Sequence, residues 1–141
     1  MNNHCYNFKS SDYEQEIQYN NIKSLVKYGI TKAIDDLRHG EFISIVTTIH
    51  EIDDILYYLL KMNYIDNYIS PHRDVENTND LAILTINNNY RIYIDSLHIE
   101  DKLRDFSSDL ICINSDEVKM SIYNTVNKYE DRVLLYQIGE E

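Results

Sequence analysis

The stretch Glu41-Phe42-Ile43-Ser44-Ile45-Val46-Thr47-Thr48, which continues through Ile49 to Met62, decides the fold class of this chain. Its first part is rich in β-branched residues and apolar on both sides, which predicts a strand covered on both faces. In its second part apolar side chains recur at helical spacing, which predicts an amphipathic helix. That stripe consists of Ile49, Ile52, Ile55, Leu56, Leu59 and Leu60. A buried strand that leads directly into such a helix indicates a sheet with helices packed on it.

The residues before this stretch predict two further helices. The first spans residues 12–28, with Ser10 or Ser11 as its N-cap and several acidic residues in its first turn. Gly29 is placed to end or kink that helix. The second helix spans residues 31–39.

The residues after it predict a hairpin and then alternating elements. Residues 81–86 and 90–94 flank three asparagines, which tolerate the left-handed backbone of a tight reversal. A long polar loop covers residues 63–80, before the hairpin. The hairpin is followed by a helix over 98–106, a strand over 110–113, a helix from Ser115 to about 129 and a strand over 132–138.

Together these elements predict an α/β fold, with α+β as the alternative. We expect a single mixed five-stranded sheet with one β-hairpin, packed by four to five helices. The length of 141 residues suits one domain. Residues 1–11 are expected to be a flexible N-terminal leader and residues 12–141 a single globular domain.

The charge of the chain excludes several classes of partner. Its 24 acidic and 13 basic side chains give a formal net charge of −11, which repels nucleic acid and anionic membranes. The N-terminus shows no secretory signal, and the longest apolar run is far shorter than the about 20 residues of a membrane helix. We therefore expect a cytoplasmic protein (in the cytoplasm of the host cell, if a phage encodes it) that binds neither nucleic acid nor membrane. Cys5 and Cys112 are expected to be free thiols in that compartment.

No motif predicts a cofactor, a metal or a catalytic residue. No glycine follows a predicted strand into a helix, so neither a dinucleotide fingerprint nor a phosphate-binding loop can be built. The cysteines and histidines lack zinc spacing, and the serines lack a recognisable nucleophile setting. A metal-dependent nuclease built from Asp95 and the triplet Glu117-Val118-Lys119 is the weakest candidate, because that triplet falls on a predicted helix.

Acidic and tyrosine side chains on predicted outer helix faces are the stronger lead. Carboxylates at i,i+4 spacing stand about 6 Å apart, comparable to the phosphates of a nucleic-acid strand. Tyrosine beside carboxylate is a good contact surface for arginine-rich partners. The candidate partner-binding residues are Asp53, Asp54, Tyr57, Tyr58, Glu100, Asp101 and Asp105.

The composition resembles that of small phage and mobile-element inhibitors, including anti-CRISPR and anti-restriction proteins. The chain is small and acidic, has only three glycines and one proline, and shows the residue bias of an AT-rich coding sequence. This resemblance implies a non-enzymatic protein that binds and blocks a basic, nucleic-acid-handling surface of a partner protein. It is a likeness of composition and rests on no motif.

Two other functions stay open. One is an α/β enzyme or small-ligand-binding protein with its site at the carboxyl ends of the strands, where open sheets place their ligands. The residues expected there are Thr48, His50, Asp95, Asn114 and Asp116. The other is a structural or regulatory homodimer.

Overall fold

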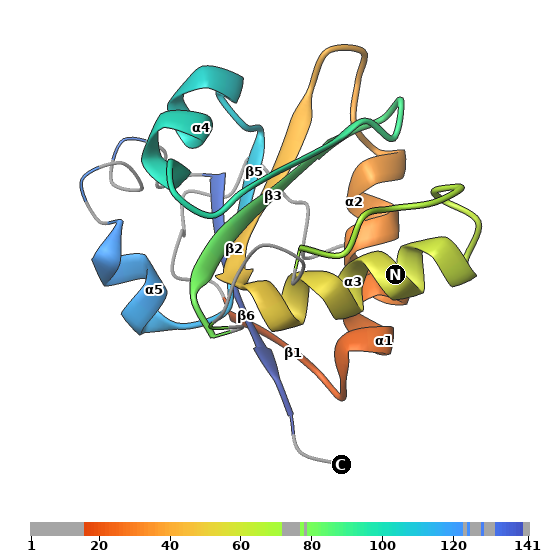
Figure 1. Cartoon of the computed structure of the whole chain (residues 1–141), viewed down its shortest axis with the longest axis horizontal. Coiled ribbons are helices and arrows are strands. Elements are labelled where there is room, and N and C mark those ends of the chain that lie inside the picture. Colours follow the sequence, from red (N-terminus) through yellow and green to blue (C-terminus); the bar gives the residue numbers. More distant parts are fainter. Residues whose placement is uncertain are drawn as a thin grey trace.

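The computed structural model describes residues 16–71, 77, 79–122, 124, 128 and 132–139, and these form a mixed sheet with helices on both faces (Figure 1). Within this part of the chain the sheet has six strands in the order β1-β6-β5-β2-β3-β4. The elements are β1 (Glu16–Tyr19), α1 (Ile22–Leu25), the π-helical turn η2 (Val26–Ile30), α2 (Thr31–Asp35), β2 (Phe42–Thr48), α3 (Ile49–Lys61), β3 (Leu81–Asn87), β4 (Ile92–Asp95), α4 (Ile99–Phe106), β5 (Leu110–Ile113), α5 (Asp116–Ser121) and β6 (Val133–Ile138).

The mixed α/β class is as predicted. Strands β1, β6, β5 and β2 run parallel, whereas β2 pairs antiparallel with β3 and β3 with β4. The β3–β4 pair confirms the predicted hairpin, and β5 and β6 follow it in the predicted order and pair in parallel. The prediction of five strands missed one, because β1 was expected to be helical.

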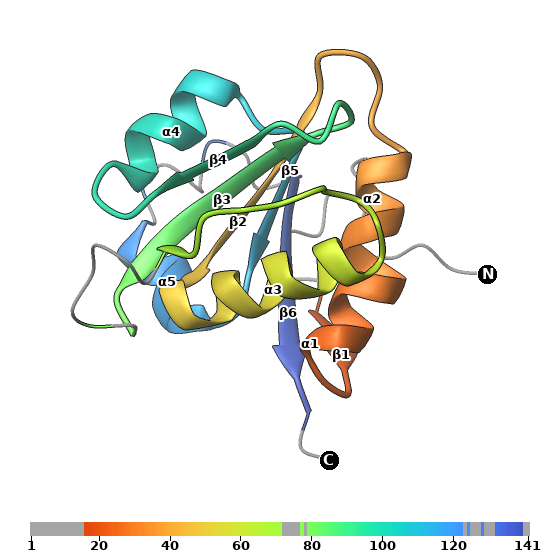
Figure 2. The ribbon, with the colours of Figure 1, turned by 45° about the vertical axis from the view of Figure 1, so that its right-hand side comes forward.

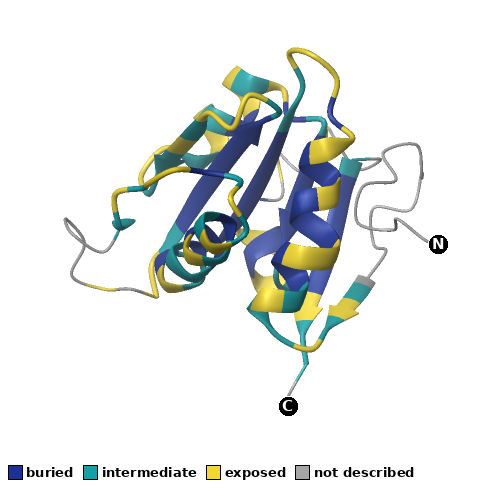
Figure 3. Ribbon diagram, turned by 90° about the vertical axis from the view of Figure 1, so that its right-hand side faces the viewer, coloured by how far each residue is buried: buried dark blue, intermediate teal, exposed yellow. Residues whose placement is uncertain are grey.

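Each face of the sheet has its own apolar core. The helix formed by α1, η2 and α2 covers the first face together with α3, while α4 and α5 cover the second face (Figure 2). Alternation along β2 explains the two layers: Ile43 and Ile45 point into the first core, and Val46 points into the second. Figure 3 shows the consequence, with buried strands inside and exposed residues on the outer sides of the helices.

Strand β1 corrects the predicted helix over residues 12–28. Ile17 lies opposite Tyr136 of β6 in parallel register, so this segment extends the sheet. The helix begins only after Asn21, whose side chain accepts a hydrogen bond from the Ser24 amide at 2.9 Å. The predicted caps Ser10 and Ser11 lie outside the described residues, as does the predicted leader over 1–11. The local sequence pattern favoured a helix here, but the segment forms a strand because it pairs with β6, which lies near the other end of the chain.

Gly29 was predicted to end or kink the helix, and it does not end it, because α2 follows directly after η2. The helix runs on through a π-turn, in which the Thr31 amide donates to the Val26 carbonyl. The Thr31 hydroxyl also donates to the Lys27 carbonyl, at 2.9 Å. A π-turn accommodates one extra residue without ending the helix.

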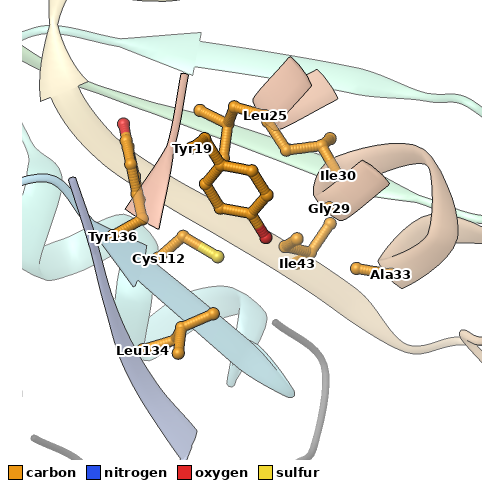
Figure 4. A pocket seen from close by; sticks show the side chains of 9 residues that line it. All are labelled: Tyr19, Leu25, Gly29, Ile30, Ala33, Ile43, Cys112, Leu134 and Tyr136. Atoms are coloured by element: carbon orange, nitrogen blue, oxygen red, sulfur yellow. The ribbon is translucent and has the colours of Figure 1, made fainter. Parts of the chain in front are cut away.

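A small apolar cavity of about 10 Å³ lies beneath this π-turn (Figure 4). The Tyr19 ring and the sulfur of the buried Cys112 point toward it. This volume is about that of one water-sized probe, and a water would find no polar partners in an apolar lining. The cavity is therefore a packing defect too small for an organic ligand.

The second half of the chain follows the predicted elements closely. The α4 and β6 elements start within one residue of the prediction, and β5 matches it. Helix α5 is described only to Ser121, and much of the predicted continuation to residue 129 lies outside the described residues. None of the helices in the described part of the chain is long and apolar enough to cross a membrane.

Candidate functional site

The outer face of α3 presents acidic and tyrosine side chains, as its helical spacing predicts. The opposite face is buried except for the half-buried Leu60, so the helix has only one orientation against the sheet. We call its outer group Asp53, Asp54, Tyr57 and Tyr58 the acid–tyrosine surface. Tyr57 is 45% exposed and meets the half-buried Tyr58 in a T-shaped contact with ring centroids 5.1 Å apart. This contact holds an exposed aromatic surface beside two carboxylates.

An open hollow of about 540 Å³ separates α3 from the start of α1. Asp54, Tyr57 and Tyr58 form one wall of the hollow. Asn21, Ile22 and Lys23 form the other wall. The hollow is wide and shallow, which suits an extended side chain of another protein better than an enclosed small molecule.

Tyr68 joins this surface, although the sequence placed it only in a polar loop. Burial raises the pKa of Tyr68, and the nearby charges of Asp53, Tyr57 and Asp54 raise it further. Asp53 in turn has one carboxylate oxygen, Oδ1, that is buried without a hydrogen-bond partner. The carboxylates of Asp53 and Asp54 therefore make the surroundings of Tyr57 and Tyr68 negative, and a cation would be attracted there.

Basic side chains of the chain itself already approach this surface, besides Lys23 on the opposite wall of the hollow. The Lys61 ammonium lies 5.9 Å from the centroid of the Tyr57 ring. His50 Nε2 lies 3.6 Å from Asp54 Oδ2, with both side chains largely exposed. Exposed pairs of this kind contribute little to stability, so an external cation could displace them at small cost.

The acidic residues of α4 form a separate patch. Glu100, Asp101 and Asp105 lie on the helix that covers the second face of the sheet, opposite to α3 (Figure 2). Asp101 is also paired with Arg104, at 2.6 Å between Oδ1 and the guanidinium. The structure therefore does not join the seven predicted partner-binding residues into one surface.

The predicted strand-end residues do not converge either. Asp95 Oδ1 accepts hydrogen bonds from the amides of Leu97 at 2.7 Å and His98 at 3.0 Å, which lowers the pKa of this carboxyl. Thr48 caps α3 by accepting from the Glu51 amide at 3.2 Å. His50 and Asp116 are exposed on helices at the two sides of the sheet. Asn114, by contrast, follows β5 and donates a hydrogen bond to Thr47 near the end of the neighbouring strand β2.

Asn114 belongs to a buried polar network that sequence reasoning missed. Its side-chain amide donates to Thr47 Oγ1 at 2.8 Å, and Thr47 donates to Glu51 Oε1 at 2.9 Å. Tyr136 donates to the same carboxylate oxygen. Burial, and next the charge of Glu51, raise the pKa of Tyr136 well above its ordinary value. Tyr136 lies among the apolar residues of β6, so no local signal marked it.

The network lies at a switch point in the sheet. Adjacent parallel strands β2 and β5 send their following helices to opposite faces, α3 to the first and α5 to the second (Figure 2). Open α/β sheets bind ligands at such points. Asn114 Oδ1 is buried there without a hydrogen-bond partner.

The residues considered for a metal-dependent nuclease do not form a site. Glu117 and Lys119 lie on α5, where Lys119 is buried, and Asp95 is engaged by its own turn. Among the described residues there is no group of three or more histidines, cysteines or carboxylates that could hold a metal ion. No family model, curated protein or solved structure matches the chain, so its function has to be inferred from its own geometry and charge.

Proposed function

We propose that this protein is a non-enzymatic interaction protein that binds a basic, nucleic-acid-handling surface of a partner protein and blocks it. The observation that carries the proposal is the exposed Tyr57 beside Asp53 and Asp54, over an open hollow. Tyrosine and arginine are among the residues most enriched at the centres of protein interfaces. With a net charge of −11 around it, this surface attracts basic partners from a distance.

The chemistry of the acid–tyrosine surface suits a guanidinium or ammonium group. A carboxylate forms charge-assisted hydrogen bonds with such a group, while a tyrosine ring attracts it through cation–π contact. The partner's basic groups would otherwise contact phosphates, so occupation by this protein would exclude nucleic acid. Because the composition of the chain resembles that of phage and mobile-element inhibitors, the partner is best sought first among proteins that defend a cell against foreign DNA.

Partner capture and competition test the proposal. A protein captured by the tagged chain is purified, and binding is measured by calorimetry at increasing salt and in the presence of a DNA or RNA competitor. The proposal predicts that affinity falls steeply with salt and that nucleic acid competes. Binding that is insensitive to salt, or that persists in a ternary complex with nucleic acid, contradicts it.

Matched variants locate the binding surface. The double variant Asp54→Asn, Tyr57→Ala is expected to weaken binding at least tenfold, since truncating an interface hot spot commonly costs about 2 kcal/mol or more. The control Asp36→Asn, Asp66→Asn removes charge at two exposed positions elsewhere and is expected to change affinity only slightly. The variant Asp101→Asn, Asp105→Asn on α4 tests the second acidic patch. Loss of binding in that variant alone would move the interface to α4.

The buried network at the switch point supports a second candidate, a small-ligand-binding protein. Its specific observation is the unpartnered Asn114 Oδ1 beside the Thr47–Glu51–Tyr136 hydrogen bonds. A thermal-shift screen of polar metabolites tests it, with Asn114→Ala as the comparison. A compound that stabilises the native chain and not Asn114→Ala would support this candidate, and a screen without such a compound would remove it.

A further inference from the structure

Strand β4 is an edge of the sheet. Within the described part of the chain it pairs with β3 alone, and Figure 2 shows it at the margin of the sheet beneath α4. Tyr93, in the middle of this strand, is 39% exposed. An edge strand offers unpaired backbone groups to any strand that can align with it.

The backbone direction of each β4 residue follows from its pairing with β3. The Asn87 amide donates to the Arg91 carbonyl at 3.4 Å, so Arg91 directs its backbone groups toward β3. Tyr93, opposite Thr85, and Asp95, opposite Ile83, have the same parity and also face β3. The amides and carbonyls of Ile92 and Ile94 consequently point away from the sheet.

A second copy of the edge segment, running antiparallel, is complementary in charge and side-chain type to the first. The segment reads Arg91-Ile92-Tyr93-Ile94-Asp95. Antiparallel pairing about a two-fold axis at Tyr93 sets Ile92 opposite Ile94, and Arg91 opposite Asp95. Ile92 and Ile94 are the residues whose backbone groups point outward, so this register forms hydrogen-bonded pairs at those positions. Backbone direction and charge therefore select the same register.

We propose that a second copy of this chain pairs with β4 in this antiparallel register and continues the sheet across a two-fold axis. Residues directly opposite in an antiparallel pair share a face, so the isoleucines of both copies would extend the first apolar layer. The Tyr93 rings would meet on the second face, with an Arg91–Asp95 pair on each side. A two-fold interface of this kind is closed and self-complementary.

The charged groups required for this contact are available. Among the described residues Arg91 is exposed and forms no salt bridge. Asp95 uses Oδ1 for the amides of Leu97 and His98, which leaves Oδ2 for the guanidinium of the second copy. The net charge of each copy opposes association, and the two Arg91–Asp95 pairs would offset part of this repulsion at the contact and fix the register. A dimer would also carry two acid–tyrosine surfaces and could engage a repetitive partner twice.

Sedimentation equilibrium of the full chain tests the proposal at about 0.15 M salt, the physiological ionic strength. The expected result is a concentration-dependent monomer–dimer equilibrium. Arg91→Glu places an acid opposite Asp95 and is expected to weaken the dimer at least tenfold. Lys32→Glu, the same charge change at an exposed position of α2, is expected to leave the equilibrium near that of the native chain. A chain that stays monomeric at all concentrations, or a dimer that Arg91→Glu leaves intact, overturns the proposal.

A disulfide tests the register itself. Directly opposite residues in a non-hydrogen-bonded antiparallel pair have Cα atoms about 4.5 Å apart, within disulfide range. In a Cys5→Ser background, Tyr93→Cys is therefore expected to cross-link rapidly to a dimer under mild oxidation. Tyr28→Cys, at another exposed tyrosine, is expected to cross-link far more slowly. Circular dichroism checks that Tyr93→Cys, which loses ring contacts with Phe42 and Phe106, remains folded. Equal cross-linking at the two positions in folded protein contradicts the register.

Discussion

Replacing Tyr136 by phenylalanine should reveal how much the buried network stabilises this fold. Tyr136 is 1% exposed, and its hydroxyl donates to the Glu51 carboxylate. Phenylalanine keeps the ring packing and removes only this hydrogen bond. Because the acceptor is a half-buried carboxylate, the free energy of unfolding is expected to fall by about 1.5–3 kcal/mol at neutral pH. Glu51 retains the Thr47 hydroxyl as a donor, which favours the lower part of that range.

The difference in stability between the native chain and Tyr136→Phe should decrease as the pH rises above 10. The folded pKa of Tyr136 is raised well above the ordinary value of 10.0, so above that pH the unfolded chain releases a proton that the folded chain keeps. The native protein then loses about 1.4 kcal/mol of stability per pH unit from this group. The phenylalanine of the variant has no such proton to lose, and the other tyrosines are common to both proteins. The stability difference between the two should therefore shrink above pH 10.

Urea unfolding followed by far-ultraviolet circular dichroism measures both quantities, from neutral pH to about pH 11. Tyr28→Phe is the matched control, because Tyr28 is 55% exposed and its substitution should change stability by less than about 0.5 kcal/mol. A similarly small effect of Tyr136→Phe at neutral pH would refute the role of this hydrogen bond. A difference that stays constant above pH 10 would refute the inference about ionisation.

Three further perturbations test other parts of the structure by the same unfolding assay. Leu56→Ala removes a fully buried side chain from the inner face of α3 and should lower the free energy of unfolding by about 2–5 kcal/mol. A decrease below about 1 kcal/mol would mean that α3 does not pack as described. Thr48→Ala removes the N-cap of α3 and should cost about 1 kcal/mol, whereas Thr48→Ser should recover most of it. Asp95 has a lowered pKa in the fold, so its stabilising effect is present above its unfolded pKa of about 3.9 and is lost as pH falls through the folded value. Asp95→Asn should therefore be less stable than the native chain at neutral pH, and the gap should close in acid; a gap that persists there would contradict the cap formed with Leu97 and His98.

The unit formed by β2 and α3 could be predicted because its signals are local. Apolar residues on both sides of Phe42–Thr48 require two covered faces, and the stripe that follows Thr48 sets the orientation of α3. Thr48 is itself a good N-cap residue, which marks the boundary. The hairpin of β3 and β4 was predictable for the same reason, since its turn residues adjoin its strands. The left-handed residue of that turn is Tyr90, however, and not one of the asparagines expected to adopt this backbone.

Strand β1 could not be predicted in this way. It is four residues long and pairs with β6 near the other end of the chain. Acidic residues and a nearby serine favoured a helix start, and nothing within the segment itself indicated the distant partner. A short edge strand gains its stability mainly from the strand it joins.

The same distinction between local and long-range signals applies to the candidate sites. By itself the sequence determined the net charge and the outer face of α3, because residues on one helix are related by a fixed local period. Only the tertiary structure decided that the acids of α4 lie on the opposite side of the sheet, that Tyr68 approaches Asp53, and that Thr47, Glu51, Asn114 and Tyr136 share hydrogen bonds. It also decided that β4 is an edge. These relations join segments far apart in the chain, and they depend on strand order and on which face each helix covers, neither of which a local pattern specifies.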